Sequence, residues 1–222
     1  MLCCSPVRPG SNRCPFSWTV DSSTDFAITF FTILTVLANV AALGIGAAAL
    51  VARLAPTAPL PQRVWATVRG ELGPTVALGL ALLVAVVSTA GSLYFSEGAG
   101  FTPCRLCWVQ RGFMYPLVAV LAVALGAAVS APGGAIGRWV RRVAGALAGV
   151  GAAVAVWHRL IEMYPSLEGS ATCDPSTPCS LVWFERLGFV TLPYMALSGF
   201  VLILALVVMA ATGERRAVTG KG

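Results

Sequence analysis

Long runs of apolar residues, separated by short polar segments, dominate the pattern of this chain. Five runs reach about 20 residues, the length that an α-helix needs to cross roughly 30 Å of hydrocarbon. None of them carries enough charge to forbid insertion into a bilayer. The pattern therefore predicts five transmembrane helices, at 26–54, 75–95, 108–130, 143–164 and 190–212.

The composition strengthens this interpretation. Of the 222 residues, 57% are hydrophobic and only 11% are charged, and the mean hydropathy of +0.82 is far above that of a soluble domain of this size. We interpret the chain as an all-α integral membrane protein. It consists of a four-helix transmembrane bundle at 74–212 and one extra N-terminal transmembrane helix at 26–54.

The first apolar run is too long for a signal peptide, and only Arg8 and Arg13 precede it, so we interpret it as a retained helix. A proline-rich linker at 55–73 separates this helix from the bundle. The tail at 213–222 is short and polar, and we expect it to be disordered. In the fourth run, Gly145 and Gly149, with Gly151 and Ala152 nearby, have the small-residue spacing that allows helices to pack closely.

The basic residues predict the orientation in the membrane. Nine of the fifteen Lys and Arg residues lie in three alternate segments, at 53–73, 131–142 and 213–222. The positive-inside rule places these segments in the cytoplasm. All seven cysteines lie in the segments that then face outward, at 1–25, 96–107 and 165–189. Disulfides persist outside the cytoplasm, so both signals predict a multi-pass cell-membrane protein with extracytoplasmic cysteines.

The net charge of +6 follows from the same basic segments. Because these segments lie at the cytoplasmic surface in the predicted topology, we attribute the charge to topology and to contact with anionic membrane lipid. We do not interpret it as binding to nucleic acid.

Two cysteine pairs are the candidate chemistry. Cys104 and Cys107 form a C-x-x-C motif directly after Pro103, where the third apolar run begins. Unpaired N–H groups and the positive end of the helix dipole favour a thiolate there, and thiolates are the species that attack disulfides. Cys173 and Cys179 lie in a polar loop that we expect to be mobile. Two dithiols at one membrane face predict a redox relay.

Each pair also has a simpler interpretation. The C-x-x-C motif can be half of a zinc site completed by Cys173 and Cys179, although no histidine lies among these cysteines and the compartment is oxidising. The loop pair alone can equally be a static structural disulfide. A membrane metal-binding protein that uses the four thiolates and a non-catalytic, disulfide-stapled membrane scaffold therefore stay open as alternatives.

Two further residues lie inside membrane segments, where polar and charged groups are costly and commonly functional. Arg111 lies one helical turn after Cys107, on the same face and at a depth of about 6 Å. His158, the only histidine, lies six residues before Tyr164, at about 9 Å depth. A guanidinium and an imidazole at similar depths suit a polar cofactor head whose carbonyl oxygens gain negative charge on reduction. The alternative is that neither residue binds a cofactor: the Arg111 side chain extends to the membrane surface, and His158, at a helix end, forms a hydrogen bond with water.

In this order, the motifs resemble the DsbB family of quinone-dependent disulfide-generating membrane proteins, including its BdbC-like branch. The resemblance spans about 74–212 and rests on four segments, at 103–116, 158–165, 171–174 and 179–193. It implies a four-helix bundle with two outer loops and a bound quinone, either ubiquinone or menaquinone. It also implies a soluble DsbA-like thioredoxin-fold partner that delivers electrons.

The resemblance further implies a role for each cysteine. The partner attacks Cys173, and Cys179 then attacks the disulfide of the membrane-proximal pair. Electrons arrive through Cys104, and Cys107 is the thiolate that meets the quinone.

By position, Arg111 and His158 match the family's residues at the quinone head group. The implied activity is that of a membrane enzyme, a quinone-dependent protein thiol-disulfide oxidoreductase. It re-oxidises the extracytoplasmic partner, passes two electrons to quinone, and so supports disulfide bond formation.

Three features depart from the family pattern. The spacing of Cys173 and Cys179 is shorter than in the best-known branch, the first helix is additional, and the cysteines of the N-terminal segment have no counterpart. These three cysteines, which can form one disulfide and leave one free thiol, are Cys3, Cys4 and Cys14. Relays of the vitamin K epoxide reductase kind are a rival, but their loop pair precedes the C-x-x-C motif, and here it follows.

Overall fold

Six α-helices make up most of the described part of the chain in this computed structural model, which describes residues 21–55, 57–169, 173 and 177–219. A π-helical turn, Tyr94–Gly98, continues the third helix, and a 3-10 turn, Pro165–Leu167, follows the fifth. The helices are α1 (Ser22–Leu54), α2 (Pro59–Glu71), α3 (Pro74–Leu93), α4 (Arg105–Ser130), α5 (Ala135–Met163) and α6 (Leu192–Thr219).

Five of these helices are long and apolar enough to cross a membrane. They are α1, α3 with its π-helical turn, α4, α5, and α6 as far as Thr212. The predicted all-α membrane fold with five spans is therefore confirmed. Two predicted runs end where the observed helices end, at Leu54 and Ser130.

Two helices are longer than the sequence pattern predicted. α5 begins at Ala135 rather than Val143, because a helix can start in the polar surface region before its apolar stretch begins. α6 continues to Thr219, so the expectation of disorder after Thr212 is wrong up to that residue. Although Gly213 follows Thr212, the next four residues, Glu214 to Ala217, are strong helix formers, and they extend an existing helix at little cost.

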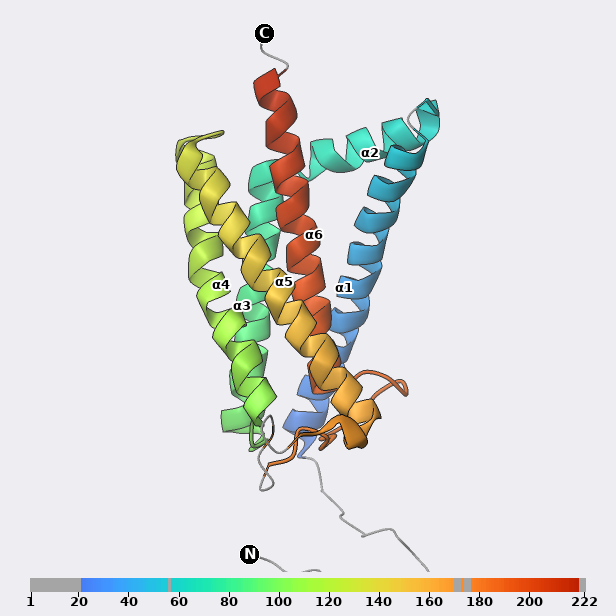
Figure 1. The fold of residues 1–222 in the computed structure, drawn as a ribbon, viewed down its shortest axis with the longest axis vertical. Coiled ribbons are helices and arrows are strands. Elements are labelled where there is room, and N and C mark those ends of the chain that lie inside the picture. The colour runs from blue at the N-terminus through green and yellow to red at the C-terminus, as the bar shows by residue number, and fades with distance from the viewer. Residues whose placement is uncertain (1–20, 56, 170–172, 174–176, 220–222) are drawn as a thin grey trace, which may run out of the picture.

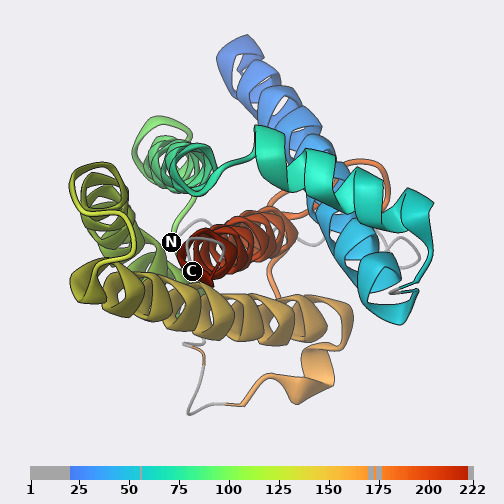
Figure 2. The same cartoon turned by 90° about the horizontal axis from the view of Figure 1, so that it is seen from above.

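The linker at 55–73 contains α2, a helix that the sequence pattern did not indicate. Pro59 and Pro61 lie in its first turn, where a missing N–H costs nothing and the fixed φ favours a helix. α2 lies across one end of the bundle (Figure 1) and connects α1 to α3 (Figure 2). Its side chains that pack against the hydrophobic core of the bundle are Trp65 and Val68.

α3, α4, α5 and α6 form the bundle, and α1 packs on α6 at its edge. α5 and α6 approach closely at Gly151, where a Cβ would lie 2.4 Å from the ring of Phe200. Of the glycine pair predicted to mediate packing, Gly145 faces α6, but a Cβ at Gly149 would meet nothing within 4 Å. That prediction is therefore wrong for Gly149, and Gly151 takes the packing role.

The chain segments that carry the described cysteines meet at one end of the bundle, which we call the thiol end. α4 begins there, α5 ends there, and the connection from α5 to α6 lies across it (Figure 1). α1 also begins at the thiol end and runs toward α2 at the opposite end. The site is therefore built where two long helices and one loop converge.

Candidate thiol site at the end of the bundle

The C-x-x-C pair occupies the first turn of α4, as the sequence predicted. Cys104 caps the helix, and its Sγ accepts a hydrogen bond from the backbone N–H of Cys107 at 3.3 Å. The two Sγ atoms are 2.9 Å apart. Cys104 is buried and Cys107 is partly buried. A free dithiol therefore sits at the positive end of the α4 dipole.

The loop pair, Cys173 and Cys179, forms a disulfide. Both residues are buried, and they pack with Cys104 in one hydrophobic cluster. Glu168 fixes the loop, because its carboxylate accepts hydrogen bonds from the Cys179 N–H at 2.5 Å and from the Ser180 hydroxyl at 2.6 Å. The fold thus brings the loop disulfide next to the C-x-x-C pair, as a relay requires.

His158 lies between the two cysteine pairs. Its Nε2 is 3.6 Å from Cys104 Sγ and 3.2 Å from the Cys179 carbonyl oxygen, and its Nδ1 is 3.1 Å from Gln110 Nε2. The Gln110 NH₂ group is a donor, so Nδ1 accepts and Nε2 carries the proton. The imidazole therefore donates toward the Cys104 sulfur and the Cys179 carbonyl oxygen. Sequence reasoning instead grouped it with Arg111 at a cofactor head.

Three hydrogen-bond donors converge on the sulfur of Cys104. The Cys107 thiol stabilises the Cys104 thiolate most, His158 and the Cys107 backbone N–H add to it, and burial acts in the opposite direction. Together they lower the pKa of Cys104 from its ordinary 9.0 to about 4. In the reduced dithiol the negative charge therefore sits on Cys104, whereas the family resemblance implies a Cys107 thiolate.

Arg111 is held against α3. Its Nε donates to the Ser92 hydroxyl at 2.9 Å, and its Nη2 donates to the Ser92 carbonyl oxygen at 2.8 Å. The guanidinium also lies over the ring of Trp108, 5.1 Å from the ring centroid, in a cation-π contact. These three contacts fix the charge on the Cys107 face of α4, within the protein.

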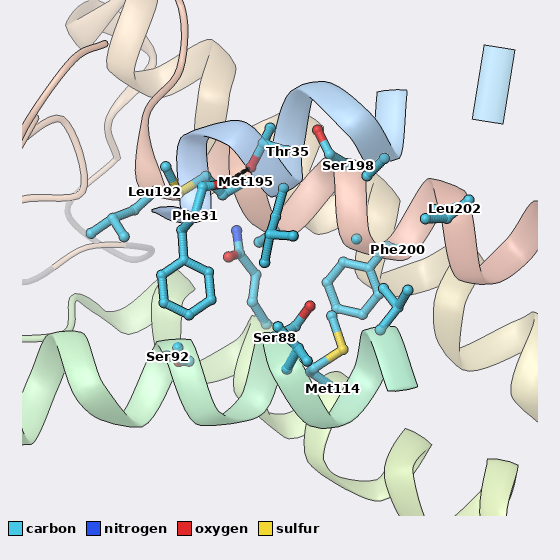
Figure 3. Close-up of a pocket in the computed structure, with 18 of the residues that line it drawn as sticks. Phe31, Thr35, Ser88, Ser92, Met114, Leu192, Met195, Ser198, Phe200 and Leu202 are labelled. Atoms are coloured by element: carbon cyan, nitrogen blue, oxygen red, sulfur yellow. Dashed lines mark hydrogen bonds between the residues drawn. The ribbon is translucent and has the colours of Figure 1, made fainter. Parts of the chain in front are cut away.

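Two cavities meet at the dithiol. The larger one, of about 590 Å³, lies between α1, α3, α4 and α6 (Figure 3). Cys107 and Arg111 are among the residues that line it. The smaller one, of about 120 Å³, is lined by Cys104, Cys107 and His158 beneath the loop. Of the two cysteines of the motif, Cys107 therefore borders both cavities and Cys104 borders only the smaller one.

Sequence reasoning missed several polar residues around these cavities. Gln110, which is buried, lines the larger cavity and bonds His158, and its polarity inside an apolar run was a usable signal. The Tyr115 hydroxyl is buried at the larger cavity and has no hydrogen-bond partner in the described part of the chain. Glu162 lines the smaller cavity, where its carboxylate accepts from Thr191 at 2.7 Å.

The structure changes the set of residues that could bind zinc. Cys104, Cys107 and His158 offer three ligand atoms within 4.8 Å of one another, so a histidine does lie among the cysteines. Cys173 and Cys179 are bonded to each other and cannot act as the other two thiolate ligands in this state. A set of three protein ligands with an open fourth position is typical of catalytic zinc rather than structural zinc.

The N-terminal cysteines, which can form one disulfide and to which the sequence assigns no role, lie outside the described residues. They are Cys3, Cys4 and Cys14.

Comparison with known proteins places these features in a family context. A family model described as "Disulfide bond formation protein DsbB" matches residues 74–177. The chain is 37% identical over 122 residues to "Disulfide bond formation protein C" of Bacillus subtilis, which covers 55% of this chain and 83% of that protein. It is 38% identical over 140 residues to "Probable disulfide formation protein" of Deinococcus radiodurans, with 58% and 84% covered. No solved structure matches the chain significantly.

Proposed function

Because this chain belongs to the DsbB family of disulfide bond formation proteins, we propose that it oxidises a DsbA-like thioredoxin-fold protein and passes the electrons to a quinone. The observation that carries the proposal is the position of the C-x-x-C pair, which lies between a buried loop disulfide and a large, mostly apolar cavity. A thiol relay needs a donor and an acceptor on different sides of one dithiol, and this geometry supplies both.

Electrons enter at the loop disulfide. A thiolate of the reduced partner attacks Cys173, breaks its bond to Cys179 and forms a mixed disulfide. The released Cys179 thiolate attacks Cys104 in the oxidised C-x-x-C pair, and Cys107 leaves as a thiolate. The partner's second thiolate then attacks its own mixed disulfide, so the partner leaves oxidised and Cys173 is released as a thiolate. The packing of Cys104 against both loop cysteines supports this sequence.

The second exchange restores the loop. The Cys173 thiolate attacks Cys179 in its bond to Cys104, which re-forms the loop disulfide and releases Cys104. The His158 Nε2–H, which is 3.6 Å from the Cys104 sulfur, stabilises this leaving thiolate. The net result is that the partner has lost two electrons and the C-x-x-C pair has gained them as a dithiol.

The charge moves between the two sulfurs of the motif during the cycle. While Cys104 is bonded to Cys179 it carries no charge, so the thiolate of the C-x-x-C motif is Cys107, next to the helix N-terminus and on the face that carries Arg111. Once the loop has re-formed, Cys104 competes for the charge through its three hydrogen-bond donors. The role that the family implies for Cys107 therefore belongs to the mixed-disulfide stage.

The residues around the larger cavity fit a quinone. Its volume of about 590 Å³ is in the range of small-molecule sites, and the buried Tyr115 hydroxyl still needs a hydrogen-bond partner among the described residues. Arg111, Gln110 and Tyr115 would hold the carbonyl oxygens of the head beside Cys107. A bound ubiquinone or menaquinone would supply the two-electron acceptor at that position.

The proposal includes the orientation of the protein. The segments rich in Arg, which contain Arg53 and Arg63, lie at the end of the bundle where α1 meets α2. The positive-inside rule assigns this end to the cytoplasm. The thiol end then faces the extracytoplasmic compartment, where a soluble thioredoxin-fold partner reaches the loop and disulfides persist.

A coupled assay tests the function directly. Purified protein is mixed with a reduced thioredoxin-fold dithiol protein and a quinone, and quinone reduction is followed by absorbance. We expect turnover by the natural chain. A partner whose second cysteine is replaced by serine is expected to attack the intact loop disulfide and to accumulate as a covalent complex through Cys173, because it cannot attack its own mixed disulfide; reductant should release it. If the natural chain gives no turnover and traps no such partner, the proposal is wrong.

The arrangement of Cys104, Cys107 and His158 favours one second candidate, a membrane metal site. Metal analysis and a free-thiol count on protein purified without reductant separate the two functions. The relay predicts two disulfides and no stoichiometric metal. A stoichiometric metal that is lost in a His158→Ala variant would instead support the metal site.

A further inference from the structure

We infer that α1 forms one wall of the acceptor cavity and that this helix makes the protein selective for acceptors that carry a long apolar tail. The inference rests on the proposed function and adds to it a role for a helix outside the family match, which begins at residue 74. It names the chemical class of acceptor, an amphiphile with a polar redox head and an apolar tail.

One face of α1 lines the cavity along the stretch from Phe31 to Ile45. The lining residues recur every three or four positions from Phe31 to Ile45, as expected for a single helix face. This stretch of fourteen residue steps corresponds to about 21 Å of helix. The facing wall on α6 runs from Leu192 to Leu206 and has the same length. The cavity is therefore elongated along the helix axes and not confined to the neighbourhood of the thiols.

The charged and amide groups of the cavity lie near the thiols, and the hydroxyl-bearing residues Thr35, Ser88 and Ser198 line it further along. Gln110, Arg111 and the hydroxyl of Ser92 lie in the half next to Cys107. Beyond Ser88 on α3 and Ser198 on α6, toward α2, the lining consists only of hydrocarbon and glycine. Its members there include Ala38, Ala41, Ile45, Leu72, Leu80 and Leu206. Such a gradient matches a ligand whose head is polar and whose remaining length is apolar, since an apolar tail gains by burial and a polar head needs hydrogen-bond partners.

Specific contacts hold α1 in this position at the thiol end. Figure 3 shows the ring of Phe31 pointing from α1 toward α3, where it lies 2.5 Å from the position that a Cβ on Gly91 would take. Only a glycine allows this approach. The same ring contacts Phe95, with ring centroids 5.5 Å apart, and an ion pair joins Asp25 to Arg186 in the segment before α6.

Two more contacts hold the rest of α1. The Asn39 amide donates to the Tyr194 hydroxyl of α6 at 3.3 Å, and the Gln62 amide of α2 donates to the Ala52 carbonyl oxygen at 2.6 Å. α1 is therefore attached to the bundle along its length by polar bonds and aromatic packing, which a simple membrane anchor does not require.

The test fills the apolar half of the cavity from the α1 side. Ala41 lines the cavity, and Ala47 lies on the same helix, exposed and away from it. The acceptors are a quinone with a long isoprenoid tail and the same head group without a tail. In Ala41→Phe we expect the KM of the tailed quinone to rise about tenfold, the order of effect of overpacking an apolar site, and that of the tail-less quinone to stay within about twofold. Ala47→Phe should change neither KM.

Two further measurements keep the test decisive if Ala41→Phe is poorly folded. Ala41→Leu introduces a smaller side chain and should raise the KM of the tailed quinone selectively, but to a smaller extent. Reduction of the C-x-x-C pair by the reduced partner reports whether each variant is folded. In the natural chain, a tailed quinone with a photoreactive group at the tail end should label α1 between Phe31 and Ile45.

The outcomes separate the two proposals. If the natural chain reduces neither quinone with reduced partner, the proposed function fails. If it reduces both but every Ala41 variant affects the two acceptors equally, or the photoreactive tail labels no residue of α1, the role of α1 fails and the proposed function stands.

Discussion

The two sides of the C-x-x-C pair differ in size, polarity and charge. On the Cys104 side lies a cavity of about 120 Å³ beneath the loop disulfide, with the polar groups of His158 and Glu162. On the Cys107 side lies a second cavity of about 590 Å³ that is mostly hydrocarbon and has Arg111 at one end. Cys107 borders both cavities, and the smaller one has the larger share of polar groups.

The backbone explains how one motif reaches both environments. Cys104 is the N-cap, in an extended conformation with φ −72° and ψ 172°, so its side chain leaves the helix toward the loop. Cys107 belongs to the first helical turn and lines the large cavity as well as the small one. The comparison teaches that the thiols of a C-x-x-C motif acquire different roles from their position at a helix start, without any difference in residue type.

The largest effect is expected from removing the thiol that faces the large cavity. Cys107→Ser should lower quinone reduction by at least about 1,000-fold, because no dithiol remains to pass electrons to the acceptor. Reaction of the reduced partner with the loop disulfide should persist, since that disulfide is intact. Coupled turnover and partner trapping, measured on the same preparation, check both statements. Substantial turnover would mean that Cys107 is not the acceptor-side thiol.

Arg111 should affect only the acceptor side. A charge-assisted hydrogen bond contributes about 1.5–3 kcal/mol, so Arg111→Met should lower kcat/KM for the quinone about 10- to 100-fold. Arg111→Lys keeps the charge but loses the paired hydrogen bonds of the guanidinium to Ser92. It should therefore recover part of the kcat/KM that Arg111→Met loses. The rate of partner-driven reduction of the C-x-x-C pair should not change. An equal loss in both half-reactions would contradict the division between the two sides.

His158 should affect the opposite side. His158→Ala removes a donor from Cys104, so the pKa of Cys104 should rise from about 4 toward 9.0, and partner-driven reduction should slow about tenfold. Ultraviolet absorbance of the thiolate, followed against pH with Cys104→Ser as the blank, measures the shift. The KM for the quinone should be unchanged, and a raised KM would place His158 at the acceptor after all.

The sign of the pH dependence follows from the lowered pKa. Because the folded pKa of Cys104 lies below its ordinary value, the charge stabilises the folded dithiol fully above pH 9. This contribution is lost progressively as the pH falls through 9 toward about 4. Thermal unfolding of the reduced protein should therefore become easier over that range, and the oxidised protein, which has no such thiolate, is the control.

The smallest effect is expected at Tyr115. A neutral hydrogen bond contributes about 0.5–1.5 kcal/mol, so Tyr115→Phe should raise the KM for the quinone about two- to tenfold. The matched control is Tyr94→Phe, since Tyr94 is also aromatic but does not line the large cavity. No change at Tyr115, with a normal response at Arg111, would show that the phenol has no role in binding the acceptor head.

Membrane insertion makes much of the fold readable from sequence. A bilayer demands about 20 apolar residues per span, so the runs at 26–54 and 108–130 were found with their correct ends at Leu54 and Ser130. α2 was missed because prolines interrupt helices in most contexts. Pro59 and Pro61 lie in the one turn that tolerates them, and only packing against the bundle distinguishes the two cases.

The sequence predicted how deep the site residues lie in the membrane, but not which neighbouring helix each side chain faces. The helical rise placed Arg111 and His158 at similar depths, but it does not tell which neighbour each helix face meets. His158 faces Cys104 and Gln110, and Arg111 faces Ser92 on α3. Contacts between helices depend on rotation about each axis, which residue spacing along one helix does not contain.

The separation of the two cavities has a consequence for steady-state kinetics. Since each substrate meets the dithiol from its own side, the thiol protein can leave before the acceptor is reduced, and no ternary complex is needed. This is a ping-pong order. Double-reciprocal plots at several partner concentrations should then give parallel lines. A compound that fills the large cavity should compete with the acceptor and act as an uncompetitive inhibitor toward the thiol protein.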